Sequence, residues 1–263
     1  MMKSFYVKSL VIAGILCLAC TTKVSEWVLL NADPGQYTLV YLHKNAVNEK
    51  VKTDNESIRK SIAGANITFR DAVKEDAVQP YYALYYGNRL FSRYDTPAQV
   101  MGVTSSPLRE KIAGEILKGK LCIMLFLNSG NAERDAKGLA ELRKAVSSSP
   151  FAAIIPVVEL SRTDQAEKHF ISMLLNVESD LKDLKEPMLF GIFGKFKALE
   201  PLVGAGITGE NINYMIEFLT ADCSCLIKDN LPGTDILYPN KWDSPATAMV
   251  NAILDSDPSL QHR

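Results

Sequence analysis

The sequence predicts an α/β protein built from two similar units in tandem. Its 263 residues are 47% hydrophobic and 22% charged, which is enough apolar mass to bury a core, and the length suggests two small domains. The same order of elements occurs twice along the chain: strand, helix, strand, connection, proline, hairpin and helix. The 29 basic residues balance 30 acidic ones, so no basic surface for nucleic acid is expected.

The first unit spans residues 37–118. Runs rich in aromatic and β-branched residues predict its strands, and apolar residues at helical spacing predict its helices. The turn Gly87-Asn88 between two such runs indicates a hairpin, and Pro107 suits the first position of a helix. The expected elements are Tyr37–His43, Asn48–Ala63, Asn66–Arg70, the hairpin Tyr81–Tyr94 and the helix Leu108–Leu117.

The second unit spans residues 120–228 and repeats this order. Its first strand is an uninterrupted apolar run, typical of a buried parallel strand, and Pro156 within the second strand indicates an irregularity or an edge. Residues 229–263 are expected to form a peripheral tail. The expected elements are Lys120–Leu127, Asn131–Val146, Phe151–Leu160, Gln165–Leu184, the hairpin Met188–Leu199 and the helix Gly209–Leu219.

The element order resembles the thioredoxin-like fold over about 37–118 and 120–228. The resemblance implies two tandem α/β sandwiches, each with a central mixed sheet flanked by helices. An unrelated α/β sandwich is the alternative. In that family a cis-proline opens the third strand beside the active site, and Pro80 and Pro187 occupy the matching places. We therefore expect both bonds to be cis.

Both units lack the cysteines of the family's catalysts. A thioredoxin-type oxidoreductase has Cys-x-x-Cys where the first strand leads into a helix, because the helix N-terminus lowers the pKa of the nucleophilic thiol. Here these junctions are residues 44–48 and 128–131, and neither contains a cysteine. The resemblance therefore implies binding or spacer domains rather than dithiol exchange at these positions.

The amino terminus has the pattern of a secretory signal. Lys3 and Lys8 precede an apolar run from Leu10 to Ala19, which is too short to span a bilayer. The segment ending at Cys20 resembles the lipobox of bacterial lipoproteins, although Cys17 and Leu18 depart from its usual residues. This implies removal of residues 1–19, lipidation of Cys20 and a lead over residues 20–36. The alternative is an ordinary signal cleaved near Ala19.

The pair Cys223 and Cys225 is the remaining chemical feature, with Lys228 as a supporting cation. The pair could be structural, including a bond to Cys122, or it could act in thiol redox chemistry. It could also bind Cu(I), since two thiolates suit a soft cation. The three histidines (His43, His169 and His262) have no ligand spacing to the pair, so no four-ligand metal site is predicted.

The sequence thus predicts a lipid-anchored protein of the bacterial cell envelope, facing the periplasm or the cell surface. The expected function is non-catalytic binding or scaffolding of an envelope protein, without a cofactor. The alternative is thiol redox or Cu(I) handling through Cys223 and Cys225.

Overall fold

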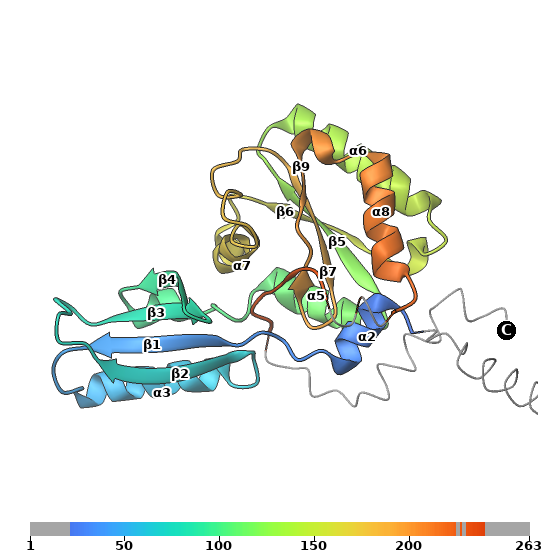
Figure 1. The fold of residues 1–263 in the computed structure, drawn as a ribbon. Helices are drawn as coiled ribbons and strands as arrows, with labels where there is room; N and C mark the ends of the chain where they lie inside the picture. The colour runs from blue at the N-terminus through green and yellow to red at the C-terminus, as the bar shows by residue number, and fades with distance from the viewer. Residues whose placement is uncertain (1–21, 225–226, 228–229, 240–263) are drawn as a thin grey trace, which may run out of the picture.

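The computed structural model describes residues 22–224, residue 227 and residues 230–239. Two sheets lie side by side in Figure 1, one for each predicted unit. Thus the predicted fold class, two α/β units with mixed sheets flanked by helices, is confirmed.

The elements of the first unit agree closely with their predicted ranges. Asn48 begins the first helix of this unit by accepting a hydrogen bond from the backbone N–H of Val51, as expected for an N-cap. The elements before the second unit are α2 (Val24–Asn31), β1 (Tyr37–His43), α3 (Glu49–Ile62), β2 (Ile67–Val73), β3 (Tyr81–Tyr86), β4 (Arg89–Tyr94), α4 (Pro97–Val100) and α5 (Pro107–Leu117).

The second unit contains the longest of the described helices, and its last described strand has only two residues. Asn131 and Thr208 cap its two long helices through their side-chain oxygens. Its helices and strands are β5 (Cys122–Asn128), α6 (Ala132–Ser148), β6 (Val157–Ser161), α7 (Lys168–Leu174), β7 (Met188–Phe193), β8 (Lys197–Ala198), β9 (Leu202–Val203), α8 (Gly209–Thr220) and β10 (Thr234–Asp235). Three 3₁₀ turns cover Ala152–Ile154, Gln165–Glu167 and Gly204–Gly206.

Both sheets have the same strand order and directions. The first sheet has the order β2-β1-β3-β4, and the second contains the matching path β6-β5-β7-β8. In each case the first two strands pair in parallel, whereas the next two pairings are antiparallel. The repeated element order in the sequence therefore corresponds to a repeated topology.

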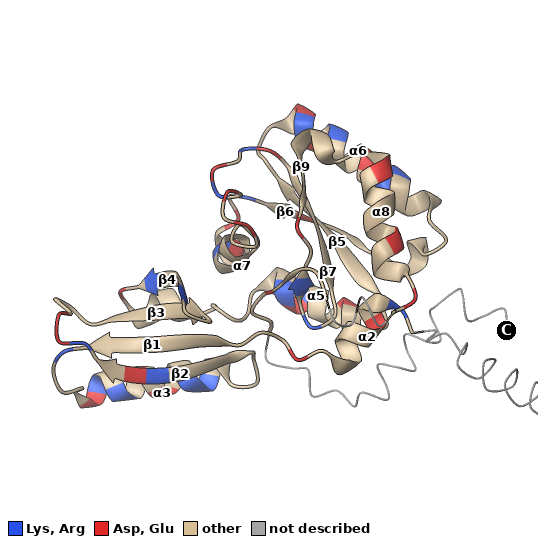
Figure 2. Cartoon of the chain, viewed as in Figure 1, with Lys and Arg blue, Asp and Glu red and all other residues tan. Residues whose placement is uncertain are grey.

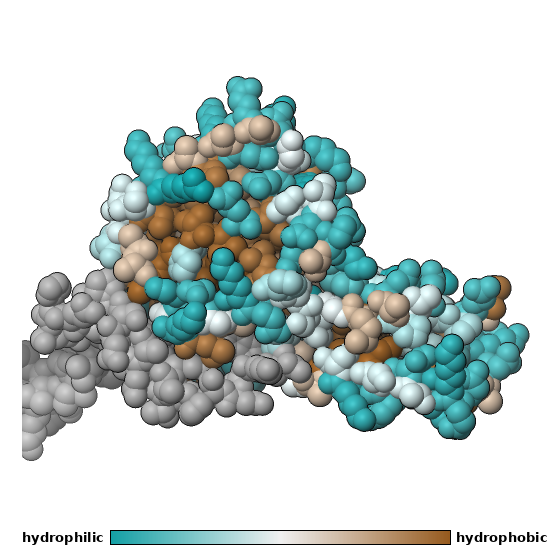
Figure 3. Space-filling model, turned by 180° about the vertical axis from the view of Figure 1, so that it is seen from behind, coloured by the Kyte–Doolittle hydropathy of each residue, from teal (hydrophilic) through white to brown (hydrophobic). Residues whose placement is uncertain are grey.

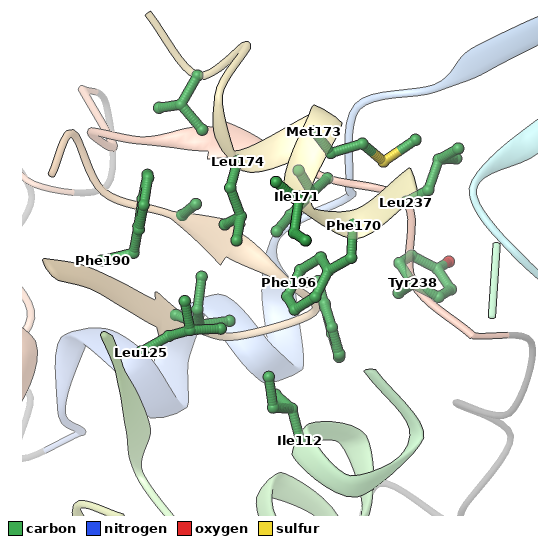
Figure 4. Packing of buried hydrophobic residues seen from close by; sticks show 14 of the residues in the cluster. Ile112, Leu125, Phe170, Ile171, Met173, Leu174, Phe190, Phe196, Leu237 and Tyr238 are labelled. Carbon is green, nitrogen blue, oxygen red and sulfur yellow. The ribbon is translucent and has the colours of Figure 1, made fainter. Parts of the chain in front are cut away.

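Strand β5 forms the centre of the second unit because both of its faces are buried. Residues 123, 125 and 127 belong to one hydrophobic cluster, and residues 122, 124 and 126 belong to another, as the alternation of side chains along a strand requires. Helices α5 and α7 contribute to the first cluster, and α6 and α8 contribute to the second. Figure 4 shows Ile112 of α5 and Phe170 of α7 on the side of the sheet where Leu125 points.

The two units share one of these hydrophobic clusters. Leu39 and Leu84 of the first sheet lie in the same hydrophobic cluster as Phe170 and Phe190 of the second unit. Helix α5, which the sequence places at the end of the first unit, packs against β5 of the second. The predicted division near residue 119 therefore separates two sheets but not two independent cores.

A carboxyl-terminal strap, residues 234–238, joins the two units. Its first two residues form β10, which pairs with β8. Further on, the Asn66 side-chain amide at the start of β2 donates to the carbonyl oxygen of Ile236, and Asn66 Oδ1 accepts from the N–H of Tyr238. This part of the predicted peripheral tail is therefore integral to the fold, while residues 240–263 lie outside the described residues.

The lead over residues 20–36 also differs from its prediction. Residues 24–31 form α2, which packs against α8 and β7. Val24 is fully buried and Val28 is nearly so, and both belong to the α6–α8 side of the core. Burial of these apolar side chains, rather than a strong local helix signal, explains why the segment is ordered on the second unit.

Two further elements are shorter than predicted. The helix expected over 165–184 ends at Leu174, where the side-chain amide of Asn176 donates to the carbonyl oxygen of Ser172 and competes with continued helix. The strand expected over 151–160 begins only at Val157. Pro156 has no N–H for the ladder, although its carbonyl oxygen accepts from the N–H of Met124.

Candidate functional site

The edge where β5 leads into α6 matches the catalytic position of the resembled family. The loop at this edge, residues 128–131, is hydrogen-bonded to side chains at the start of α6 and within the loop. The carboxylate of Asp135 accepts hydrogen bonds from the N–H groups of Ser129 and Gly130, at 2.8 and 3.0 Å, and from the Ser129 hydroxyl. Asn131 accepts from the N–H of Arg134. With several donors engaged and no cysteine in the loop, the edge is built as a rigid corner.

A groove of about 450 Å³ lies beside this corner. Arg134 and Lys137 of α6 line it together with Glu186, and Arg134 forms an ion pair with Glu186 across it. Figure 2 shows charges of both signs along the exposed side of α6. None of the described residues that line the groove is a cysteine or a histidine. The full lining is Arg134, Lys137, Gly138, Glu141, Glu186, Pro187, Gly204, Ala205, Ile207 and Thr208.

The apolar floor of the groove depends on a close approach of α6 to the sheet. A Cβ atom at Gly138 would lie 3.1 Å from the ring of Phe126, tighter than ordinary contact. On the opposite wall, the guanidinium of Arg162 donates to the carbonyl oxygens of Leu184 and Glu186. The groove is therefore held by packing on one side and by hydrogen bonds on the other.

The prediction that cis peptide bonds precede Pro80 and Pro187 is wrong. The described residues contain no cis peptide bond, so the bonds before Pro80 and Pro187 are trans. Both residues lead into extended strands, which the ordinary trans form accommodates, and the Pro187 carbonyl oxygen accepts from the N–H of Gly204 across the strand pairing. Pro187 lines the groove.

A smaller hollow of about 200 Å³ occupies the equivalent edge of the first unit. Pro80, His43 and Asn48 are among its lining residues. The Nδ1 atom of His43 lies 2.7 Å from the carbonyl oxygen of Asn45, and its ring stacks on Tyr41. His43 is thus held in place by local contacts.

The described cysteines are buried. Cys122 is fully buried within β5, and burial raises the pKa of its thiol to about 12, which removes it as a nucleophile at neutral pH. Cys223 is 3% exposed, and its backbone N–H donates to the carbonyl oxygen of Thr22. Cys20, Cys225, Lys228 and His262 lie outside the described residues, so lipidation and a thiol pair stay predictions.

The described part of the chain holds no group of three or more His, Cys, Asp or Glu side chains placed to bind a metal. His169, which the sequence left without a partner, lies at the junction of the units. Its ring makes an edge contact with Tyr94, with ring centroids 5.6 Å apart. Cu(I) binding by Cys223 and Cys225 stays a prediction, because Cys225 lies outside the described residues.

A second hollow, of about 580 Å³, lies on another side of α8. Its lining is mostly apolar, and Glu178 and Glu200 are the charged residues in it. Figure 3 shows apolar side chains exposed on the second unit within a border of polar ones. The apolar residues that line this hollow include Val177, Leu199, Leu202, Met215 and Phe218.

Sequence reasoning did not find Arg134, Lys137 and Glu186 as a set. Arg134 and Glu186 are separated by 52 positions and belong to no motif. The available signal was indirect, because Glu186 directly precedes a proline that the element order had already placed at the family's active-site edge.

The chain was compared with protein families, curated proteins and solved structures, and only solved structures are similar to it. No protein-family model matches the chain, and no curated protein matches it. One similar solved structure is that of ERdj5 form II, with 9% identity and a TM-score of 0.27 over 70% of this chain. The aligned part spans only 27% of that protein. Another contains the first two thioredoxin domains of Eps1p from Naumovozyma dairenensis, with 12% identity and a TM-score of 0.22. The alignment covers 88% of this chain and 95% of that structure.

Among the described residues, no helix combines the length and apolar character needed to cross a bilayer.

Proposed function

We propose that this protein is a lipid-anchored binding protein of the bacterial envelope, which holds a protein partner at the groove between α6 and residues 204–208. The observation that carries the proposal is the loop at residues 128–131. It occupies the catalytic position of the resembled family, but its N–H groups bond to Asp135 and no thiol lines the adjacent groove. Such an edge can bind but cannot exchange disulfides.

The groove has the chemistry of a protein-binding surface. Its floor is apolar, and its rim offers Arg134 and Lys137 as cations beside Glu141 and Glu186 as anions. Mixed charges around an apolar centre give orientation and specificity to a polypeptide partner. The predicted lipidation of Cys20 would hold this surface at the membrane, facing the periplasm or the cell surface.

A photo-cross-linking experiment in the native host tests the proposal. A benzoylphenylalanine at Ala205, an exposed groove residue, should cross-link to a defined protein. Lys137→Glu should reduce that product severalfold because it reverses a charge at the rim. Lys144→Glu is the matched control, since it lies two turns further along the same helix and outside the groove.

The result that contradicts binding at this groove is the absence of a specific product at Ala205, or a product that both charge reversals reduce equally. The alternative function, thiol redox or Cu(I) handling, predicts instead that Cys223→Ser abolishes stoichiometric Cu(I) binding or disulfide cycling of the mature protein. We expect Cys223→Ser to leave the cross-linked product unchanged.

A further inference from the structure

We infer that the second unit rests directly on the membrane, with the carboxyl end of α8 toward the lipid and the groove beside α6 facing away from it. This inference rests on the proposed lipid anchor at Cys20 and deepens it. The inference specifies how the second unit is oriented on the membrane, which end of it contacts the lipid, and which class of partner can reach the groove.

The start of the described chain is fixed to the end of α8 by backbone hydrogen bonds. The carbonyl oxygen of Thr22 accepts from the N–H of Cys223 at 2.8 Å, and the N–H of Val24 donates to the carbonyl oxygen of Ala221 at 2.9 Å. Between them, Lys23 and Asp222 form an antiparallel bridge. Residues about 200 positions apart in sequence are thus paired as in a sheet.

Side chains strengthen this attachment. Lys23 Nζ lies 2.9 Å from Asp222 Oδ1, and the lysine side chain is only 10% exposed. The buried hydroxyl of Ser25 donates to the carbonyl oxygen of Leu219 at 2.8 Å. Because Val24 and Val28 are also buried, the segment cannot peel away from the second unit without exposing apolar surface.

The covalent tether between this attachment and Cys20 is very short. Successive Cα atoms are 3.8 Å apart, so the Cα atom of Cys20 lies within about 8 Å of that of Thr22. Acyl chains on Cys20 would be buried in the hydrocarbon region, which places this residue at the lipid surface. Only Thr21 separates Cys20 from the attached segment, so the neighbourhood of Cys223 must lie close to the lipid headgroups.

The groove lies at the opposite end of α8. Thr208, which caps the amino end of this helix, lines the groove, whereas Ala221 and Cys223 follow its carboxyl end. The twelve residues of α8 give a length of about 18 Å. Figure 1 shows α2 near one end of α8 and the start of α6 near the other.

The length of α8 separates the groove from the attached end by about 18 Å along the helix. With α8 directed away from the bilayer, the occupant of the groove should therefore be a polypeptide that extends beyond the lipid surface. A soluble protein or the extramembrane part of a membrane protein meets this condition. A lipid headgroup does not, since the groove faces away from the bilayer.

Tryptophan quenching in proteoliposomes tests this orientation on the mature, full-length protein. The chain contains two tryptophans, Trp27 of α2 and Trp242, so Trp242→Phe leaves a single probe near the anchor. A matched probe at the groove is Ala205→Trp combined with Trp27→Phe and Trp242→Phe. The quencher is phosphatidylcholine brominated near the headgroup end of its acyl chains, and mass spectrometry of the same sample measures N-terminal acylation.

We expect acylated protein in which Trp27 fluorescence falls at least twofold in brominated vesicles while fluorescence from Ala205→Trp is unchanged. Insertion of eight Gly and Ser residues between Thr21 and Thr22 should preserve acylation but reduce the quenching of Trp27. Acylated protein with an unquenched Trp27, or with equal quenching at both probes, overturns the orientation and leaves the anchor standing. A mature chain without acyl mass overturns the anchor itself, and the orientation with it.

Discussion

The phenol of Tyr37 donates a hydrogen bond of 2.9 Å to the backbone carbonyl oxygen of Asp235. The two residues are 198 positions apart, and they join the first strand of the first sheet to the strap that pairs with the second sheet. Burial raises the pKa of Tyr37 well above its usual range, so the hydroxyl remains a donor at neutral pH. The contact shows that the carboxyl-terminal strap is part of the junction between the units.

Tyr37→Phe should lower the free energy of unfolding by about 1 kcal/mol, because it leaves a buried carbonyl without this donor. Urea denaturation followed by circular dichroism measures the change. Tyr214→Phe is the control, since Tyr214 is 60% exposed, and it should change stability by only a few tenths of a kcal/mol. Equal effects of the two substitutions would show that the junction bond contributes nothing.

Truncation should distinguish the strap from the rest of the tail. A chain ending at Pro239 retains the described strap contacts and should unfold at nearly the wild-type urea concentration. A chain ending at Leu231 loses Asp235, the partner of the buried Lys197 at 3.0 Å. An unpaired buried ammonium is costly, so this shorter chain should be insoluble or unfolded. A stable, monomeric protein ending at Leu231 would contradict the role given to the strap.

Arg109 should be among the least replaceable residues of the fold. It is fully buried, and its guanidinium donates to the carbonyl oxygens of Gly102, Val103 and Leu237. Burial lowers its pKa to about 10, which still leaves it charged at neutral pH.

Arg109→Lys keeps the charge but loses the forked set of donors. We expect a loss of about 3 kcal/mol in the free energy of unfolding, since at least one buried carbonyl is left unsatisfied. Arg143→Lys, at an exposed ion pair with Glu159, should cost less than about 1 kcal/mol. A small effect at Arg109 would mean that the junction can rearrange around a lysine.

The junction should also weaken in acid through His169. Burial, followed by the nearby charges of Lys168 and Arg109, lowers its pKa to about 4. The unfolded chain, with a histidine pKa near 6.5, then binds a proton more readily than the folded chain. The contribution of His169 to the free energy of unfolding is therefore fully present above about pH 6.5 and is lost as the pH falls toward 4.

Because His169 is only partly buried, the expected loss between pH 7 and pH 5 is reduced to about 1 kcal/mol. Urea midpoints across this range measure it, and His169→Gln should remove this part of the pH dependence. An unchanged pH profile in that variant would assign the acid sensitivity to other groups.

Local patterns in the sequence determined the individual elements. The hairpin Tyr81–Tyr94 follows from two β-rich runs around Gly87-Asn88, and the helix beginning at Gly209 follows from one apolar stripe. The absence of cysteine from both strand-to-helix junctions was equally plain. These features depend on neighbours within a few residues, which is why one sequence suffices to predict them.

Only the tertiary structure decided how these elements are joined. It placed α2 on α8 through Lys23 and Asp222, and α5 on the second sheet instead of the first. It also brought Arg134 to Glu186 and Asn66 to Ile236. Each of these contacts links residues far apart in the chain, and its free energy comes from burying particular surfaces against one another. Periodicity within a segment reports which face is apolar, but not which distant face will cover it.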